Sequence, residues 1–314
     1  MTSQTARRLT GVVPPVCTPL TAEGDVDVSS LERLVDFLLD GGVDGLFTLG
    51  STSEVAFLTD RQRAVAVETV VTRVAGRVPV LAGVIDMTTP RVVEHAVEAV
   101  KLGCDGVVVT APFYTRTHPV EIERHFRVTA ERVGSAIYAY DLPVSVHNKL
   151  NGGMLLDLAA EGMLAGLKDS SGDDGGLRRL ILAREERGSE VDDFSILTGA
   201  ELTVDLALSM GADGVVPGLG NVDPVGYATL YRLCREENWA AARTEQARLV
   251  RLMSIVDVAP EDRMGRGSSA LGAFKAALHL RGVIECARTA EPQIPLNDTE
   301  IDAVRQHLDT AGLL

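Results

Sequence analysis

One short phrase recurs three times along the chain and limits the folds that the chain can adopt. The copies read GVDGLFTL, GCDGVVVT and GADGVVPG, at residues 42–49, 103–110 and 211–218. Each copy follows a segment of helical periodicity, and its first glycine suits a helix C-terminus, where a positive φ is needed. The Asp-Gly pair then turns the chain into a continuous apolar run, which is typical of a strand buried on both faces. The repeated unit is therefore predicted to be helix, turn and strand.

Five further segments have the composition of buried strands. They cover residues 11–17, 78–84, 135–140, 164–168 and 194–199. Together with the three repeats they make eight strands, and helical patterns lie between most of them. Alternating strands and helices in this number predict an α/β fold, a (β/α)8 TIM barrel. An open doubly wound sheet is the competing topology, and the chain has no GxGxxG turn to favour it.

The pattern changes after residue 224. Three segments with helical periodicity follow, at 227–258, 268–283 and 299–314. The sequence therefore predicts two parts, a (β/α)8 barrel over residues 1–224 and a C-terminal helical extension over residues 225–314.

Composition and charge exclude several classes of protein. The chain has 314 residues, of which 46% are hydrophobic and 24% charged, as in a globular protein. A net charge of −14 opposes binding to nucleic acid or to an anionic membrane surface. The four cysteines show no CxxC pair, the N-terminal stretch lacks the apolar core of a signal peptide, and the apolar runs are too short to span a membrane. We expect a cytoplasmic protein that binds neither nucleic acid nor membrane.

Lys168, in the stretch AGLKDSSG, ends one predicted strand and is one of only four lysines among 30 basic residues. Catalytic groups in a TIM barrel gather at the C-terminal ends of the strands. A neutral lysine there can attack a ketone carbonyl and form a Schiff base, and burial favours the neutral amine. Arginine stays charged and cannot play this part. The alternative is a lysine whose charged head reaches from a strand end into solvent.

Two other strand ends carry groups that could assist such an amine. Tyr140 could shuttle the proton that iminium formation requires, or it could be a packed tyrosine with a satisfied hydroxyl. The loop GSTSE, at 50–54, offers hydroxyls and backbone N–H groups that can bind a carboxylate, or it could be an ordinary Ser/Thr turn. The six histidines show no HxH or HExxH spacing, so we expect neither a metal nor another cofactor.

Four motifs together resemble one known family. GSTSE, APFYTR (111–116), YDLP (140–143) and GLKDSSG (166–172), in this order and spacing, resemble the dihydrodipicolinate synthase / N-acetylneuraminate lyase family. The likeness runs over nearly the whole chain, and the combination of motifs is more specific than any single piece. The family fold is a (β/α)8 barrel with a C-terminal helical extension.

The resemblance implies roles for four residues at one site. Lys168 would be the Schiff-base lysine that binds pyruvate or another 2-keto acid, and Tyr140 would be the proton-relay tyrosine. The backbone N–H groups of Ser51 and Thr52 would hold the keto-acid carboxylate, and the Ser51 hydroxyl would join the relay.

The resemblance also implies an assembly. Family members are usually tetramers built from two tight dimers, and Tyr114 matches a tyrosine that passes across a subunit interface into the neighbour's relay. Val216 matches a residue whose backbone carbonyl faces the site. We therefore expect a homotetramer, a dimer of dimers, whose ligands are a small-molecule keto acid and an aldehyde.

Two departures from the family pattern and one match bear on the site. Ser53 replaces the usual glycine of the loop motif. In dihydrodipicolinate synthases an arginine two residues after the proline of YN-x-P grips the carboxylate of aspartate semialdehyde, and here that position is Ser145. Glu201 falls where sugar-acid lyases of the family carry an acidic residue for substrate hydroxyls. The last two features favour a polyhydroxy or otherwise non-standard aldehyde.

The sequence therefore predicts a metal-independent class I aldolase or lyase that acts on pyruvate or a 2-keto acid and an aldehyde, with a 2-keto-3-deoxy acid type of substrate. One alternative is 4-hydroxy-tetrahydrodipicolinate synthase itself, with a basic group such as Lys149 or Arg116 on the second carboxylate. A deoxy-keto-sugar-acid dehydratase that uses the same iminium is also open. So is a keto-acid sensor without catalysis, because fold does not fix function.

Overall fold

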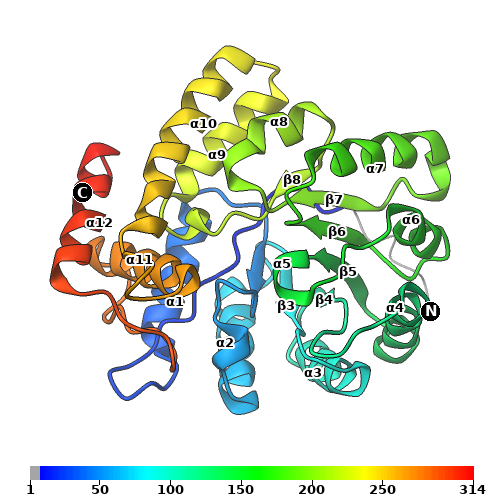
Figure 1. Ribbon diagram of the computed structural model, residues 1–314, viewed down its shortest axis with the longest axis horizontal. Helices are drawn as coiled ribbons and strands as arrows, with labels where there is room; N and C mark the ends of the chain where they lie inside the picture. Colours follow the sequence, from blue (N-terminus) through cyan, green and yellow to red (C-terminus); the bar gives the residue numbers. More distant parts are fainter. Residues whose placement is uncertain (1–7) are drawn as a thin grey trace.

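Eight parallel strands form the centre of the molecule and confirm the predicted TIM barrel (Figure 1). The computed structural model describes residues 8–314; the first seven residues, on which part of the expected absence of a signal peptide rests, lie outside the described part. The strands pair in the order β1-β8-β7-β6-β5-β4-β3-β2. Their bounds are β1 Gly11–Val12, β2 Leu46–Thr48, β3 Val80–Gly83, β4 Gly106–Thr110, β5 Ala136–Asp141, β6 Gly166–Asp169, β7 Ser195–Thr198 and β8 Gly214–Val215.

The segment that follows β1 closes the ring against β2. Pro15 forms a parallel bridge with Phe47. The Phe47 N–H donates to the Pro14 carbonyl at 3.0 Å, and the Phe47 carbonyl accepts from the Val16 N–H at 2.9 Å. Closure places the C-terminal ends of all eight strands around one mouth, where the active sites of such barrels form.

Helices surround the barrel and extend it at one side (Figure 1). Their bounds are α1 Val28–Asp40, α2 Asp60–Val74, α3 Thr89–Lys101, α4 Pro119–Val133, α5 Pro143–Val146, α6 Gly152–Ala160, α7 Asp174–Arg187, α8 Val204–Ser209, α9 Pro224–Arg235, α10 Trp239–Met253, α11 Arg266–Leu280 and α12 Asp298–Thr310. No helix within residues 8–314 is both long and apolar enough to cross a membrane. The predicted boundary at residue 224 falls where α9 begins, and the division of the chain into two parts stays a prediction.

The three repeated phrases begin at the N-terminal face of the barrel and run into β2, β4 and β8. In each, the first glycine has a positive φ, which confirms the predicted turn after the helix. These φ values are 80° for Gly42, 97° for Gly103 and 102° for Gly211. The aspartate of each repeat also accepts a hydrogen bond from a backbone N–H of an adjacent strand. The pairs are Asp44 with Val12 at 2.8 Å, Asp105 with Val80 at 2.8 Å and Asp213 with Ile196 at 2.7 Å. Each repeat therefore starts one strand and anchors the beginning of another.

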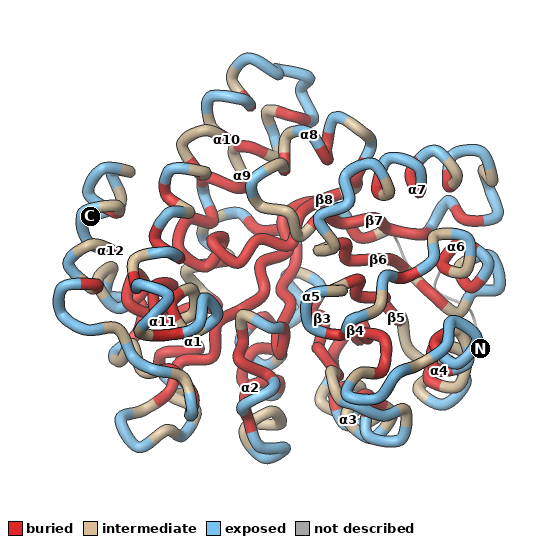
Figure 2. The backbone as a smooth tube through the Cα atoms, in the orientation of Figure 1, coloured by how far each residue is buried: buried red, intermediate tan, exposed pale blue. Residues whose placement is uncertain are grey.

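Buried side chains form two clusters, one inside the barrel and one between the strands and the helices. Figure 2 shows burial concentrated in the strands and on the inward faces of the helices. The interior cluster contains Leu9, Val13, Phe47, Leu81, Val108, Tyr138, Tyr140, Leu197 and Val216. Full burial of a large apolar side chain contributes ~1.5–3 kcal/mol. The barrel interior is therefore a packed core, and a ligand can bind only at the mouth, where the C-terminal ends of the strands lie.

Candidate active site

Lys168 and Tyr140 lie side by side at the mouth of the barrel. They occupy paired positions in the register of β6 and β5, and only 7% and 3% of their surfaces are exposed. The Lys168 Nζ lies 4.1 Å from the centroid of the Tyr140 ring and 5.1 Å from that of Phe47. The lysine therefore does not extend into solvent, and the structure brings together the two residues that the sequence predicted to act on a carbonyl.

A glycine that sequence reasoning missed makes room for this lysine. Gly199 follows β7, and a Cβ at that position would lie 2.0 Å from Oγ of Ser170 and 3.3 Å from Cε of Lys168. A larger residue would displace the side chain of Ser170 and crowd that of Lys168. The sequence signal for this role was the glycine of TGAE, because a glycine in or beside a strand often marks a place where another group comes close to the backbone.

The hydroxyl of Tyr140 is surrounded by polar groups although the residue is buried. Burial raises the pKa of the phenol, but the charge of Lys168 and hydrogen bonds with Ser51, Lys168 and Ser170 outweigh it, so the pKa lies below its usual value. A phenol whose pKa is lowered releases a proton more readily near neutral pH, which suits proton transfer. Sequence reasoning identified Ser51 as a partner of Tyr140 and missed Ser170.

The loop after β2 presents two backbone N–H groups without a partner in the described chain. The turn closes through the N–H groups of Ser53 and Glu54, which donate to the carbonyls of Gly50 and Ser51 at 3.1 and 3.0 Å. Within residues 8–314, the N–H groups of Ser51 and Thr52 donate no hydrogen bond. Ser51 is exposed and Thr52 half-buried, so both N–H groups are available to an anionic ligand.

Ser53, which stands where the family usually has glycine, anchors this loop. It is fully buried; its hydroxyl donates to the Val16 carbonyl and accepts from the Gly50 N–H at 3.0 Å. Its own carbonyl accepts from the Thr18 hydroxyl at 2.9 Å. The backbone of Ser53 does not adopt a positive φ, so the position does not require glycine. The substitution ties the loop to the segment after β1.

Val216 follows β8 inside the barrel, in the same cluster as Tyr140. Its N–H donates to the Thr198 carbonyl at 2.8 Å, whereas its own carbonyl accepts no hydrogen bond from residues 8–314. A buried carbonyl is usually paired with some donor. The Val216 carbonyl is therefore free to accept from a donor on a ligand, and its role in the site stays a prediction.

Glu201 lies just past β7, and its carboxylate already holds the loop after β8. It accepts from the N–H groups of Gly218 and Leu219 at 2.8 and 2.9 Å, and from the Tyr227 hydroxyl at 2.7 Å. Burial raises the pKa of this carboxyl, although these bonds and the charge of Lys168 oppose the rise. The sequence did not predict this anchoring role. Because a carboxylate offers about four acceptor positions, Glu201 keeps room for one further donor.

The position of the family arginine is an exposed serine, and the lysine four residues later is engaged elsewhere. Ser145 lies on the short helix α5 and is exposed. The Lys149 ammonium pairs with the buried carboxylate of Asp141 and lies 3.7 Å from that of Asp169. Lys149 is therefore held beside β5 and β6 by two carboxylates, whereas Arg116 is exposed in the loop after β4.

Tyr114 projects from the loop between β4 and α4. Its exposed fraction is 89%, and its φ of 75° is a left-handed conformation that costs a non-glycine residue roughly 1–3 kcal/mol. An aromatic ring held outward by a strained backbone is suited to contact with another chain. The role of Tyr114 in a neighbouring subunit's site stays a prediction.

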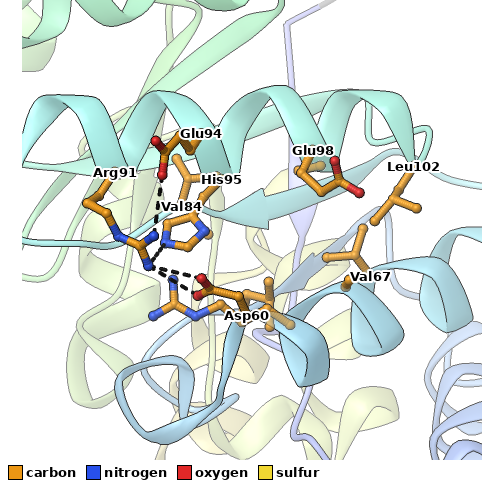
Figure 3. Close-up of a pocket in the computed structure, with 13 residues that line it drawn as sticks. Asp60, Val67, Val84, Arg91, Glu94, His95, Glu98 and Leu102 are labelled. Atoms are coloured by element: carbon orange, nitrogen blue, oxygen red, sulfur yellow. Dashed lines mark hydrogen bonds and ion pairs between the residues drawn. The ribbon is translucent and has the colours of Figure 1, made fainter.

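A separate cavity of about 210 Å³ lies between α2 and α3 (Figure 3). Along its edge Arg91 contacts Asp60 at 3.1 Å and Glu94 at 3.3 Å, and the His95 Nε2 lies 3.0 Å from Asp86. None of the predicted catalytic residues lines this cavity. Its charged groups pair with one another or with residues of the surrounding helices and loops, so the cavity belongs to helix packing and not to the chemistry at the mouth.

The fold and the site together define a class of protein, a TIM-barrel enzyme with a buried lysine and a buried tyrosine paired at the mouth of its barrel. The chain matches the model of the Dihydrodipicolinate synthetase family over residues 8–311 and belongs to that family. Members of the family are lyases and aldolases, and the chain is an enzyme of the class I aldolase type.

The relatives differ in the substrates that their names give. An uncharacterised DapA-like lyase of Halobacterium salinarum is 33% identical over 306 residues, which is 98% of this chain and 95% of the relative. A probable 2-dehydro-3-deoxy-D-pentonate aldolase of Escherichia coli is 31% identical over 251 residues, 79% of this chain and 82% of the relative. Several others, 29% to 31% identical, are named 4-hydroxy-tetrahydrodipicolinate synthase. The likeness thus gives the family and leaves the second substrate open.

The solved structure of one relative has a similar fold and contains a ligand. YagE of E. coli, a dihydrodipicolinic acid synthase family protein solved in complex with pyruvate, superposes with a TM-score of 0.89 at 26% identity. The match covers 97% of this chain and 99% of YagE. The likeness therefore includes the C-terminal helices as well as the barrel.

Proposed function

We propose that this enzyme cleaves a 2-keto-3-deoxy acid into an aldehyde and pyruvate, or a related 2-keto acid, through a Schiff base on Lys168. The observation that carries the proposal is the buried contact between Lys168 and Tyr140, with Nζ 4.1 Å from the ring centroid. A protein that only sensed a keto acid would need neither a buried nucleophile nor a proton donor beside it.

The proposed mechanism follows from these groups. The Lys168 amine adds to the C2 carbonyl, and the carbinolamine loses water to give an iminium. Tyr140, in contact with the Ser51 hydroxyl, protonates the departing hydroxyl. A base then removes the proton of the C4 hydroxyl, the C3–C4 bond breaks, the aldehyde leaves, and the electron pair passes to the nitrogen as an enamine. Protonation at C3 and hydrolysis release pyruvate and restore the free amine.

The substrate carboxylate is proposed to bind the loop after β2. The unpartnered N–H groups of Ser51 and Thr52 can each donate to it, and a hydrogen bond to a charged group contributes roughly 1.5–3 kcal/mol. Local donors are needed because the net charge of −14 repels an anion. The unpaired carbonyl of Val216 would accept from a hydroxyl formed at the reacting carbon.

The aldehyde half is proposed to be neutral and hydroxylated. Ser145 offers no charge to a second carboxylate, and Lys149 is held by Asp141 and Asp169. Glu201 has capacity for one more donor, such as a substrate hydroxyl. The name of the E. coli pentonate aldolase supports this substrate class.

The names of the synthase relatives support a second candidate, condensation of pyruvate with aspartate semialdehyde. The same enamine would then attack the aldehyde, and the exposed Arg116 is the group that could meet the second carboxylate. The two candidate reactions share the enamine and differ in the aldehyde that reacts with it or leaves it.

Steady-state assays distinguish the two candidates. Cleavage of 2-keto-3-deoxypentonate and 2-keto-3-deoxygluconate is followed by the pyruvate released, and condensation by the loss of aspartate semialdehyde in the presence of pyruvate. We expect at least one cleavage reaction to have the higher kcat/KM. A kcat/KM for aspartate semialdehyde above that of every 2-keto-3-deoxy acid would make the protein a synthase.

A further inference from the structure

A buried ion pair joins the loop after β2 to the C-terminal helices. Glu54 is the last residue of GSTSE, and Lys275 lies in the middle of α11; each has only 1% of its surface exposed. The carboxylate and the ammonium are in direct contact. The sequence singled out neither residue as part of the site, because the two are far apart along the chain.

The remaining hydrogen bonds of this pair go to the segment between α11 and α12. The second carboxylate oxygen of Glu54 accepts from the Ala290 N–H at 2.6 Å and from Nε2 of Gln293 at 3.1 Å. The Lys275 ammonium donates to the Arg288 carbonyl at 2.8 Å. Both charges are thus satisfied by residues 288–293, and the segment, α11 and the loop form one hydrogen-bonded unit.

Glu54 is also linked directly to the N–H groups that face the mouth. Its own N–H donates to the Ser51 carbonyl at 3.0 Å, and its φ of 62° is left-handed, a conformation that persists in a non-glycine residue only where the surroundings impose it. A displacement of Glu54 would therefore turn the peptide units of Ser51 and Thr52. Stability alone does not account for the pair, because apolar residues often replace a buried ion pair without loss of stability.

We infer that Glu54 and Lys275 are positioning residues: their ion pair holds the Ser51 and Thr52 N–H groups in the orientation that binds the keto-acid carboxylate. The inference rests on the proposed function. It makes the C-terminal segment 288–293 part of the apparatus that recognises the substrate, although none of its residues was predicted to touch the keto acid.

The test compares two ketones, one of which lacks the carboxylate. Trapping of the iminium with borohydride is measured as a function of pyruvate and of acetone, in the wild-type protein and in the double variant Glu54→Gln/Lys275→Met, which leaves no lone buried charge. The half-saturating concentration of pyruvate should rise about tenfold or more, the loss expected when a charged hydrogen bond is misaligned, and that of acetone should stay within about twofold. Lys101→Met, which removes an exposed lysine paired with Glu98 on α3, is the control and should change neither value.

The outcomes separate this inference from the proposed function. Absence of trapping by pyruvate in the wild-type protein would refute the Schiff base itself. Normal trapping in the wild-type protein, with unchanged or equally weakened affinity for both ketones in the double variant, would refute only the positioning role.

A second measurement does not depend on the folding of a variant. Because coupling between two sites is reciprocal, saturating pyruvate should slow hydrogen exchange of the Ala290 amide and its neighbours in residues 288–293 of the wild-type protein. Unchanged exchange in this segment, at a pyruvate concentration that occupies Lys168, would contradict the inference.

Discussion

Removal of the Tyr140 hydroxyl should greatly reduce activity and leave the folded structure almost unchanged. In Tyr140→Phe the ring keeps its contact with Lys168 and its edge-to-face packing on Phe47, where the centroids lie 6.5 Å apart. The proton relay is lost, so kcat should fall by ~10²–10⁴-fold while the melting temperature changes little. Steady-state kinetics and thermal unfolding measure the two effects. A near-normal kcat would mean that Tyr140 only packs.

Ser145 should decide how well the enzyme accepts a second carboxylate. An arginine there could make a bidentate contact with aspartate semialdehyde, which contributes roughly 1.5–3 kcal/mol. Ser145→Arg should therefore raise kcat/KM for pyruvate plus aspartate semialdehyde by about one to two orders of magnitude, and Ser145→Ala should leave it unchanged. The prediction is wrong if the wild-type protein already accepts this aldehyde as well as Ser145→Arg does.

Individual residues of the site were predictable from the sequence where a motif and a strand end coincide. Lys168 and Tyr140 meet both conditions, and the structure places them in contact. Gly199 follows the end of β7 but belongs to none of the four family motifs, and Ser170 belongs to GLKDSSG but follows the end of β6. The roles of both residues come from contacts between adjacent strands that depend on register. The anchoring role of Glu201 was missed for the same reason.

At the scale of secondary-structure elements, the strands were predictable and their lengths were not. Residues 11–17 were expected to form one strand, yet β1 covers only Gly11–Val12. Pro14 and Pro15 have no N–H to donate, so the regular ladder ends before them. The chain then continues along β2 through single bonds such as Val16 N–H to Phe47 carbonyl. The pattern of apolar residues indicates which residues are buried, whereas the prolines determine where the regular hydrogen bonding of the strand ends.

The packing of α4 against α3 should be sensitive to acid. His125 on α4 is 2% exposed, and its Nδ1 lies 2.9 Å from the Thr89 hydroxyl of α3. Burial lowers the pKa of His125 from 6.5 to about 4, although a contact with the Thr110 backbone opposes the shift. Between these values the unfolded chain binds the proton and the folded chain does not. The contribution of this residue is therefore complete above pH 6.5 and is lost as the pH falls toward 4, by up to about 3 kcal/mol.

A single substitution isolates that effect from the titration of carboxylates. The free energy of unfolding of the wild-type protein and of His125→Gln is measured by denaturant titration between pH 7 and pH 4.5. The wild-type value should fall more steeply with acid than the value of the variant. Parallel curves would show that His125 titrates normally in the folded state.

At the scale of the whole molecule, the role predicted for Tyr114 requires an oligomer, such as the expected homotetramer, in which one subunit completes the site of another. Tyr114→Phe and Lys168→Ala should each be inactive or nearly so, since one lacks the relayed phenol and the other lacks the nucleophile. Mixed and reassembled, the two should regain activity, because a site with a normal Lys168 can receive Tyr114 from the Lys168→Ala subunit. Sedimentation of the active protein should show a dimer or larger. Full activity in a monomer would contradict the role of Tyr114.

The overall architecture was predictable because the helix–turn–strand repeat is local in sequence. The contacts that connect distant parts of the chain were not. The pair of Glu54 and Lys275 has no periodic or motif signature, and its members are close only because the C-terminal helices gather beside the barrel (Figure 1). Residues outside the barrel therefore support the loop after β2, and the sequence pattern alone did not predict this support.

The central claim is that Lys168 is the nucleophile, and trapping tests it most directly. The wild-type protein is incubated with pyruvate and sodium borohydride, digested, and its peptides are mapped by mass spectrometry. We predict one modified peptide, carrying the reduced pyruvate adduct on Lys168, and none in Lys168→Arg. The buried Lys275 and the ion-paired Lys149 should stay unmodified. An adduct on another lysine, or no adduct under conditions of turnover, would contradict the account.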